Sequence, residues 1–145
     1  MHDSFSKFLA NYLDVWRNSS ITELKGIISQ EYKAREITDG AIDDFGYEES
    51  IDGWEQGFKF AKKNNAQWDL NVLSILPLRE GEAMAIISAT LVIQGNSLET
   101  ANLFFQTFKK SNTSEWKLVR SYIEAGIPYD KTNNKLSTSW DHSKS

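Results

Sequence analysis

The chain contains no cysteine, and its two histidines, His2 and His142, both lie in terminal segments. Without cysteine there is no disulfide, no catalytic thiol and no thiolate metal ligand. Histidine is the side chain that most often serves as a neutral-pH base and as a metal ligand, so a histidine-based active site or zinc site is not expected either. Glycine-rich phosphate loops and the G-x-S-x-G elbow are also missing. We therefore predict neither a metal nor a cofactor.

Long apolar runs and concentrated positive charge are absent as well. No stretch of 18 apolar residues occurs, and the start MHDSFSKFLA has neither the basic segment nor the apolar core of a signal peptide. The net charge is −4, and the basic pairs Lys62-Lys63 and Lys109-Lys110 are isolated. This lacks the electrostatic footprint of a nucleic-acid-binding protein. We expect a cytoplasmic protein that interacts with neither membranes nor nucleic acids.

Aromatic residues, in contrast, are abundant. The 145 residues include five Trp, five Tyr and eight Phe, and 40% of all residues are apolar. That is enough to build one hydrophobic core without cross-links. We predict a single domain over residues 1–129. The remaining residues, 130–145, read as a polar and flexible tail in which Trp140 is the one large aromatic side chain.

The first half of the chain contains three stretches with apolar residues at helical spacing. They cover residues 4–18, a shorter stretch that begins after Ser20, and residues 51–63 after Ser50. Between the second and the third, residues 31–38 alternate weakly and predict a short strand. An acidic loop with two glycines is expected over residues 39–49.

The acidic loop has two interpretations. A pair such as Asp43-Asp44 could bind a cation or act as a base in catalysis. We favour the other interpretation, a hydrated acidic cluster near the start of a helix, where negative charge is favourable.

The second half reads as four long strands joined by short polar turns. They are expected over residues 67–78, 83–94, 98–109 and 115–129. The second of them is apolar on both faces and should be central in its sheet. Strands of about 12 residues extend ~40 Å and must twist and curl. We predict an α+β fold in which three helices pack on a curved, mostly antiparallel sheet and form a cone with an open end.

The element order and three local patterns resemble the nuclear-transport-factor-2-like (NTF2-like) superfamily. The patterns are the aromatic first helix F-x-x-F-L-x-x-Y-L-x-x-W, the third helix SIDGWEQGF and the last strand WKLVRSYIEAGI. The resemblance covers residues 4 to about 128, and relatives include ketosteroid isomerases and SnoaL-like polyketide cyclases. It implies a hydrophobic pocket between sheet and helices, and often a homodimer through the outer face of the sheet. It implies no reaction, because one fold hosts many functions.

The catalytic sets of two such relatives cannot be placed on this sequence. Ketosteroid isomerases use a tyrosine with two acids, and limonene epoxide hydrolases use an Asp-Arg-Asp set. Neither set can be matched residue by residue, so the resemblance assigns no catalytic residue to this chain.

Candidate pocket residues come first from the last strand. Alternation places Trp116, Leu118, Arg120, Tyr122 and Glu124 on one face. If this face lines the cone, Arg120, Tyr122 and Glu124 are polar groups in an apolar pocket, where Arg120 can hold a carboxylate or enol oxygen and Tyr122 an oxyanion. If it is the outer face, the same residues belong to a salt-bridge network or to a dimer interface.

The helical side of the cone supplies the remaining candidates. Tyr12, Trp16, Trp54 and Phe58 should line the cavity, although any helix that faces a core shows the same spacing. Tyr32 joins Tyr12 as a candidate because buried hydroxyl groups need partners.

We thus predict a protein that binds a small apolar or aromatic molecule in the cone without catalysis of its own. The first alternative is an isomerase, cyclase or dehydratase that uses pocket tyrosine and carboxylate groups for proton transfer. The second alternative is a dimeric interaction module whose cone is filled by core side chains.

Overall fold

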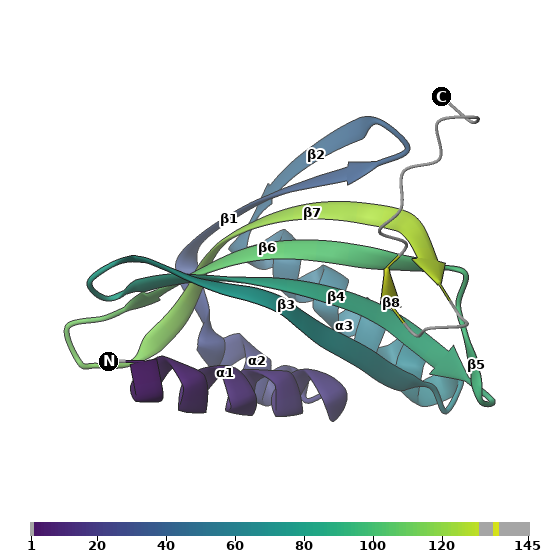
Figure 1. Ribbon diagram of the computed structural model, residues 1–145, viewed down its shortest axis with the longest axis horizontal. Helices are drawn as coiled ribbons and strands as arrows, with labels where there is room; N and C mark the ends of the chain where they lie inside the picture. Colours follow the sequence, from purple (N-terminus) through teal and green to yellow (C-terminus); the bar gives the residue numbers. More distant parts are fainter. Residues whose placement is uncertain (1, 131–134, 137–145) are drawn as a thin grey trace.

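Three helices pack against one curved, mixed β-sheet in the computed structural model, which describes residues 2–130 and 135–136 (Figure 1). The predicted α+β fold class is confirmed. The helices are α1 (His2–Arg17), α2 (Ile21–Ile27) and α3 (Tyr47–Lys63). The strands are β1 (Ile28–Thr38), β2 (Ala41–Gly46), β3 (Gln67–Arg79), β4 (Glu82–Ile93), β5 (Asn96–Ser97), β6 (Thr100–Lys110), β7 (Trp116–Asp130) and β8 (Lys135–Leu136).

The predicted C-terminal tail is described only in part. Its residues Lys135 and Leu136 form β8, which pairs with the end of β7. Residues 131–134 and 137–145, with Trp140 and His142, lie outside the described residues.

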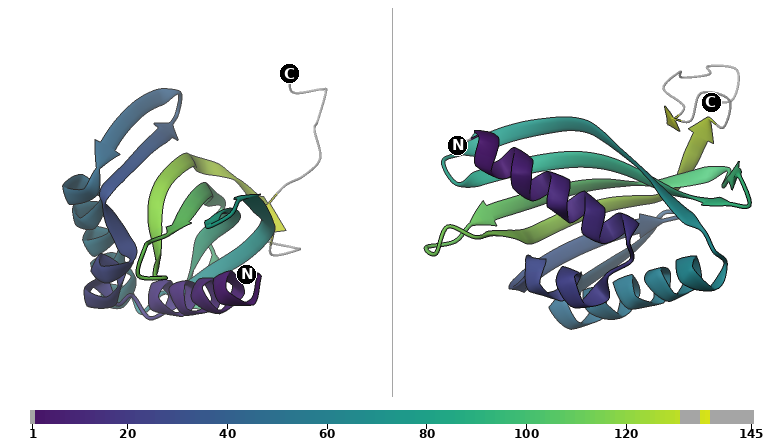
Figure 2. Two further views of the ribbon diagram at one scale, coloured as in Figure 1. Left: turned by 90° about the vertical axis from the view of Figure 1, so that its left-hand side faces the viewer. Right: turned by 90° about the horizontal axis from the view of Figure 1, so that it is seen from below.

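The sheet has the strand order β2-β1-β7-β6-β4-β3, with β5 added beside β4 and β8 beside β7. The four long strands are antiparallel neighbours, as the polar turns predict. β1, which begins at Ile28 and is longer than the predicted strand over residues 31–38, lies parallel to β7, and this pairing brings residues about 90 positions apart into one ladder. The sheet curls so that its concave face is directed toward the helices (Figure 2).

The segment predicted as an acidic loop is a β-hairpin followed by a helix. Asp39 and Gly40 have φ of 50° and 80°, which is the left-handed backbone that a tight hairpin turn requires. The turn brings β2 back along β1, and α3 begins directly after β2 at Tyr47, four residues earlier than predicted. Asp43 and Asp44 therefore lie on opposite faces of a strand.

A bulge in β7 reverses the alternation of that strand. Phe108 of β6 pairs with Leu118, but the preceding Thr107 pairs with Arg120, so Val119 is an extra residue without a partner of its own. Before the bulge Leu118 faces the helices, and after it Ser121 does so. Arg120, Tyr122 and Glu124 therefore have the orientation opposite to that predicted, and a second register shift between Glu124 and Ile127 ends this reversed stretch.

The core between α1 and the sheet is built from aromatic rings. Phe108 is fully buried, and its ring centroid lies 5.5, 5.4 and 5.3 Å from those of Phe5, Phe8 and Tyr12. The Tyr12 hydroxyl donates a hydrogen bond of 2.7 Å to Gln106 Oε1. Gln106 Nε2 in turn lies 3.3 Å from Ser121 Oγ. This end of the cone is therefore densely packed.

Candidate functional site

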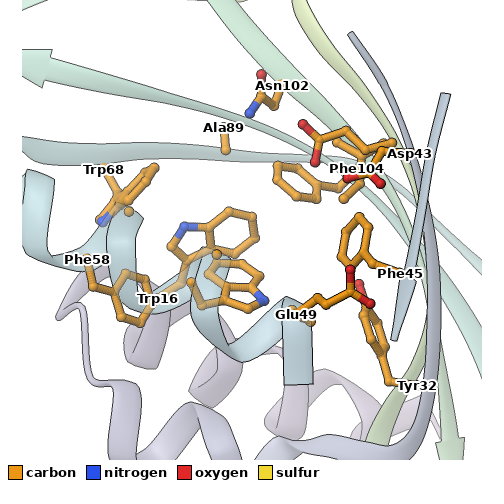
Figure 3. A pocket seen from close by; sticks show the side chains of 16 residues that line it. Trp16, Tyr32, Asp43, Phe45, Glu49, Phe58, Trp68, Ala89, Asn102 and Phe104 are labelled. Carbon is orange, nitrogen blue, oxygen red and sulfur yellow. The ribbon is translucent and has the colours of Figure 1, made fainter. Parts of the chain in front are cut away.

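The other end of the cone is hollow. A cavity of about 330 Å³ lies between the concave face of the sheet and α3 (Figure 3). Its wall is largely aromatic and one end is acidic. The residues that line it are Trp16, Tyr32, Glu36, Asp43, Phe45, Glu49, Ser50, Gly53, Trp54, Gly57, Phe58, Trp68, Ala89, Asn102, Phe104 and Ile123.

The aromatic wall is a network of rings from α1, α3 and the sheet. The centroid of Trp16 lies 4.8 Å from that of Trp54 and 5.1 Å from that of Phe104, both at nearly perpendicular angles. Phe58 lies 5.6 Å from Trp54 and 6.3 Å from Trp68. These contacts fix the rings, so the apolar wall is formed before any ligand binds.

Two glycines of α3 leave room in the cavity. Gly53 and Gly57 are one helical turn apart and both line the cavity, and a Cβ atom added at either position would meet no atom within 4 Å. A glycine inside a helix costs about 1 kcal/mol relative to alanine. With alanine at these two positions α3 would be more stable. The space that the missing side chains leave is part of the cavity.

The acidic end is formed by the β1-β2 hairpin and the first turn of α3. Glu36 and Asp43 are directly opposite each other across the two strands. Asp43 and Glu49 are exposed and Glu36 is half-buried, so this end is the mouth of the cavity. Figure 3 shows Asp43 and Glu49 on the side of Phe45 and Tyr32, away from Phe58.

These three carboxylates have no cationic partner within residues 2–130 and 135–136. Among the described residues, Glu36, Asp43 and Glu49 form no ion pair, and no lysine, arginine or histidine lines the cavity. On the outer face the situation is different, because Asp44 accepts hydrogen bonds of 2.7 and 2.8 Å from Arg35. The described residues thus leave the negative charge at the mouth uncompensated.

Further polar side chains line the cavity, and among them Trp16, Asn102 and Tyr32 carry hydrogen-bond donors. The indole Nε1 of Trp16 is buried and has no acceptor among the described residues. Asn102 Oδ1 accepts a hydrogen bond of 3.0 Å from the Gly126 amide, and its amide nitrogen is turned toward the cavity (Figure 3). Burial raises the pKa of Tyr32 to about 12, with a smaller opposing effect of the Ser121 hydroxyl, so Tyr32 is neutral near pH 7.

Four of the predicted pocket residues, Trp16, Tyr32, Trp54 and Phe58, line the cavity. The prediction for Tyr12 is wrong, because its side chain is fully buried in the dense core and its hydroxyl is used by Gln106.

The predictions for Arg120, Tyr122 and Glu124 are also wrong, because the bulge at Val119 turns all three to the outer face. Arg120 Nη2 lies 3.6 Å from Glu82 there. The Tyr122 hydroxyl donates a hydrogen bond of 2.5 Å to Glu124. The outer-face interpretation of the last strand is therefore the one that the structure supports.

Neither the acidic mouth of the cavity nor the open space beside Gly53 and Gly57 was predicted from the sequence. The Asp39-Gly40 dipeptide is a strong hairpin signal, and alternation on both sides of it would have placed Glu36 opposite Asp43. The spacing of Gly53 and Gly57 in an otherwise helical segment was a second available signal. Asn102 and Phe104 carried no such signal, because only the curvature of the sheet brings them over α3.

No group of three or more metal-ligating side chains occurs within residues 2–130 and 135–136. In the same part of the chain, no helix combines the length and the apolar character that crossing a membrane requires.

Solved structures with this architecture are numerous. One is a NTF2-like protein of unknown function from Pseudomonas putida KT2440, with a TM-score of 0.67, 10% identity, and coverage of 96% of this chain and 94% of that one. Another is a NTF2-like protein of unknown function from Shewanella oneidensis MR-1, with a TM-score of 0.64, 14% identity, and coverage of 85% and 98%. A third is a domain of unknown function with a cystatin-like fold from Nostoc punctiforme, with a TM-score of 0.65, 13% identity, and coverage of 87% and 77%.

Sequence comparison adds nothing to these structural matches. No protein-family model matches the chain, and no curated protein matches it. Identities this low establish the fold alone, which is the NTF2-like fold that the element order resembles.

Proposed function

We propose that this chain, which has the NTF2-like fold, binds a small and largely apolar molecule in the cavity between α3 and the sheet. The observation that carries the proposal is an open cavity of about 330 Å³ whose aromatic wall is already formed. Cavities of roughly 300–1,000 Å³ with apolar walls and a few polar groups are typical of ligand sites. Gly53 and Gly57 support the proposal, because they keep this volume open at a cost in helix stability.

A leucine at position 57 should block the site. We expect Gly57→Leu to weaken binding of N-phenyl-1-naphthylamine, a neutral apolar dye, by at least about tenfold, because the new side chain projects into the cavity. Dye fluorescence measured during titration with protein gives the affinity. The matched control is Gly26→Leu, since Gly26 is also helical and open around its Cβ but lies on α2, away from the cavity.

Equal binding by the two variants would place the dye elsewhere on the molecule and contradict the proposal. Absence of dye binding by the wild-type protein would do the same. Thermal unfolding of both variants shows whether each is folded, and we expect neither to be destabilised, because leucine is a better helix former than glycine.

A catalytic role is the alternative proposal. Its support is the neutral Tyr32 hydroxyl in the same cavity as Glu36, which together provide a proton donor and a carboxylate. Simple binding is favoured, because Asp43 and Glu49 are exposed at the mouth rather than desolvated beside a bound substrate. The second alternative, a cone filled by side chains, is not favoured by the open cavity.

We also propose that two copies associate through the sheet, at β3. This edge strand carries five apolar side chains that are 38% to 50% exposed, and they are Val72, Leu73, Ile75, Leu76 and Leu78. Such a concentration on an edge strand is unusual for an exposed surface. An apolar edge strand can pair with the same strand of a second copy, which is a contact that a two-fold dimer allows.

Charge introduced on β3 should separate the copies. We expect the wild-type protein to sediment as a dimer and the double variant Leu73→Lys/Leu76→Lys as a monomer, because association would bury positive charge. Ile42→Lys is the control, since Ile42 is 62% exposed but lies on β2 at the opposite edge of the sheet. A monomeric wild-type protein in analytical ultracentrifugation would overturn this proposal.

A further inference from the structure

We infer that the ligand of the cavity is a small organic cation, an amine or quaternary ammonium group attached to an apolar body that also carries a hydrogen-bond acceptor. This inference deepens the proposed binding function and rests on it. Three features of the cavity support it independently: the charge of the mouth, the rings of the wall, and an unpartnered donor in the interior.

The charge of the mouth is negative, and the described part of the chain places no cation in an ion pair with it. Glu36 and Asp43 are cross-strand neighbours, and like charges directly opposite each other destabilise a β-ladder. The adjacent Asp44 shows that this hairpin can neutralise an acid, because Arg35 lies beside it on the outer face. On the cavity face no such cation is supplied by the described residues, so a cationic ligand would remove the repulsion.

The rings of the wall suit an organic cation. Trp54 and Phe104 are nearly parallel with centroids 6.3 Å apart, and Trp16 stands perpendicular to both. The faces of such rings attract ammonium groups, and cages of aromatic rings are how proteins bind quaternary ammonium ligands. A bare metal ion fits less well, because the described residues provide no group of three metal-ligating side chains.

The unpartnered donor is the indole N–H of Trp16. Trp16 is 1% exposed, lines the cavity, and finds no acceptor for its Nε1 among the described residues. A buried donor without an acceptor is unfavourable, and a hydroxyl or carbonyl oxygen of a ligand that reaches it would satisfy it. The amide nitrogen of Asn102 offers a second donor to the same ligand. The cavity thus presents carboxylates at its mouth and donors inside.

A pair of isosteric phenols tests the charge directly. 3-(Trimethylammonio)phenol and 3-tert-butylphenol have the same shape and differ only in a charged nitrogen in place of a carbon. At pH 6.5 and low salt, we expect the cation to displace N-phenyl-1-naphthylamine from the protein at a concentration at least about tenfold lower than the neutral phenol. Addition of salt should narrow the difference, because the mouth is exposed to solvent.

Neighbouring residues of β2 provide matched variants. Glu36→Gln/Asp43→Asn removes two of the three carboxylates of the mouth, and we expect it to abolish most of the preference for the cation. Asp44→Asn removes a charge one residue away on the outer face, and we expect it to keep the preference. The double variant should fold at least as well as the wild-type protein, since it removes a like-charge pair.

The outcomes separate the inference from the proposed function. If both phenols displace the dye at equal concentrations, or if the preference for the cation survives Glu36→Gln/Asp43→Asn, the inference of a cationic ligand is overturned. Dye binding by the wild-type protein would still support the cavity as a binding site. A wild-type protein that binds no dye contradicts the proposed function itself. If Asp44→Asn loses the preference for the cation as strongly as the double variant does, the preference is a general effect of surface charge. That result would also overturn the inference.

Discussion

Truncation of Phe108 to alanine is expected to lower the free energy of unfolding by about 3–5 kcal/mol, the usual cost of removing a fully buried aromatic ring. Phe108 is 0% exposed, and three aromatic rings of α1 lie within 5.5 Å of it, centroid to centroid. The space left behind cannot collapse easily, because α1 is held against the sheet on both sides of it. Urea unfolding followed by tryptophan fluorescence measures the loss.

Phe60 provides the matched control for this substitution. It is also a phenylalanine, but it is 48% exposed on the outer side of α3. We expect Phe60→Ala to change the free energy of unfolding by no more than about 0.5 kcal/mol, as for other surface substitutions. Similar costs for the two variants would mean that α1 does not pack on the sheet as described.

Alkaline pH is expected to destabilise the protein by about 3 kcal/mol through Tyr32 alone. Burial raises the pKa of Tyr32 from its ordinary value of 10.0 to about 12. Each unit of difference between folded and unfolded pKa corresponds to about 1.4 kcal/mol of stability. Burial also raises the pKa of Tyr12 well above its ordinary value, so Tyr12 adds to the effect in the same direction.

The sign and the pH window follow from the direction of the shift. A tyrosine whose pKa is raised in the folded protein holds its proton more tightly there than in the unfolded chain, so stability is complete below pH 10 and falls between pH 10 and about 12. Urea unfolding at a series of pH values measures the decline. We expect Tyr32→Phe to show a shallower decline than the wild-type protein. An unchanged slope in this variant would contradict a buried, neutral Tyr32.

The residues Arg120, Tyr122 and Glu124 illustrate where local reasoning fails. Alternation correctly places these three residues on one face, but which face it is depends on the extra residue Val119, and only the pairing of β7 with β6 reveals that residue. A single bulge exchanges the two faces of everything beyond it. The error also changed the expected ligand, because Arg120 in the cavity predicts an anion, whereas the cavity itself offers carboxylates.

The hairpin of β1 and β2 illustrates a different failure. Its acidic composition suggested a hydrated loop, although Asp39-Gly40 is a good turn sequence. The low strand propensity of these acidic residues is outweighed by the hydrogen bonds of a complete ladder between β2 and β1. This matters for the proposed function, because the alternation of a strand directs Asp43 to the cavity face and Asp44 to the outer face. A loop would not fix these two directions.

The sequence by itself determined the helices, the four long strands, the α+β class and the aromatic character of the cone, because these follow from residue periodicity over short stretches. Trp16, Trp54 and Phe58 could be chosen in this way, since a helix has one apolar face. Only the tertiary structure decided which groups share the cavity. The parallel pairing of β1 with β7, the bulge and the curvature of the sheet join residues far apart in the chain, and no local pattern records those contacts.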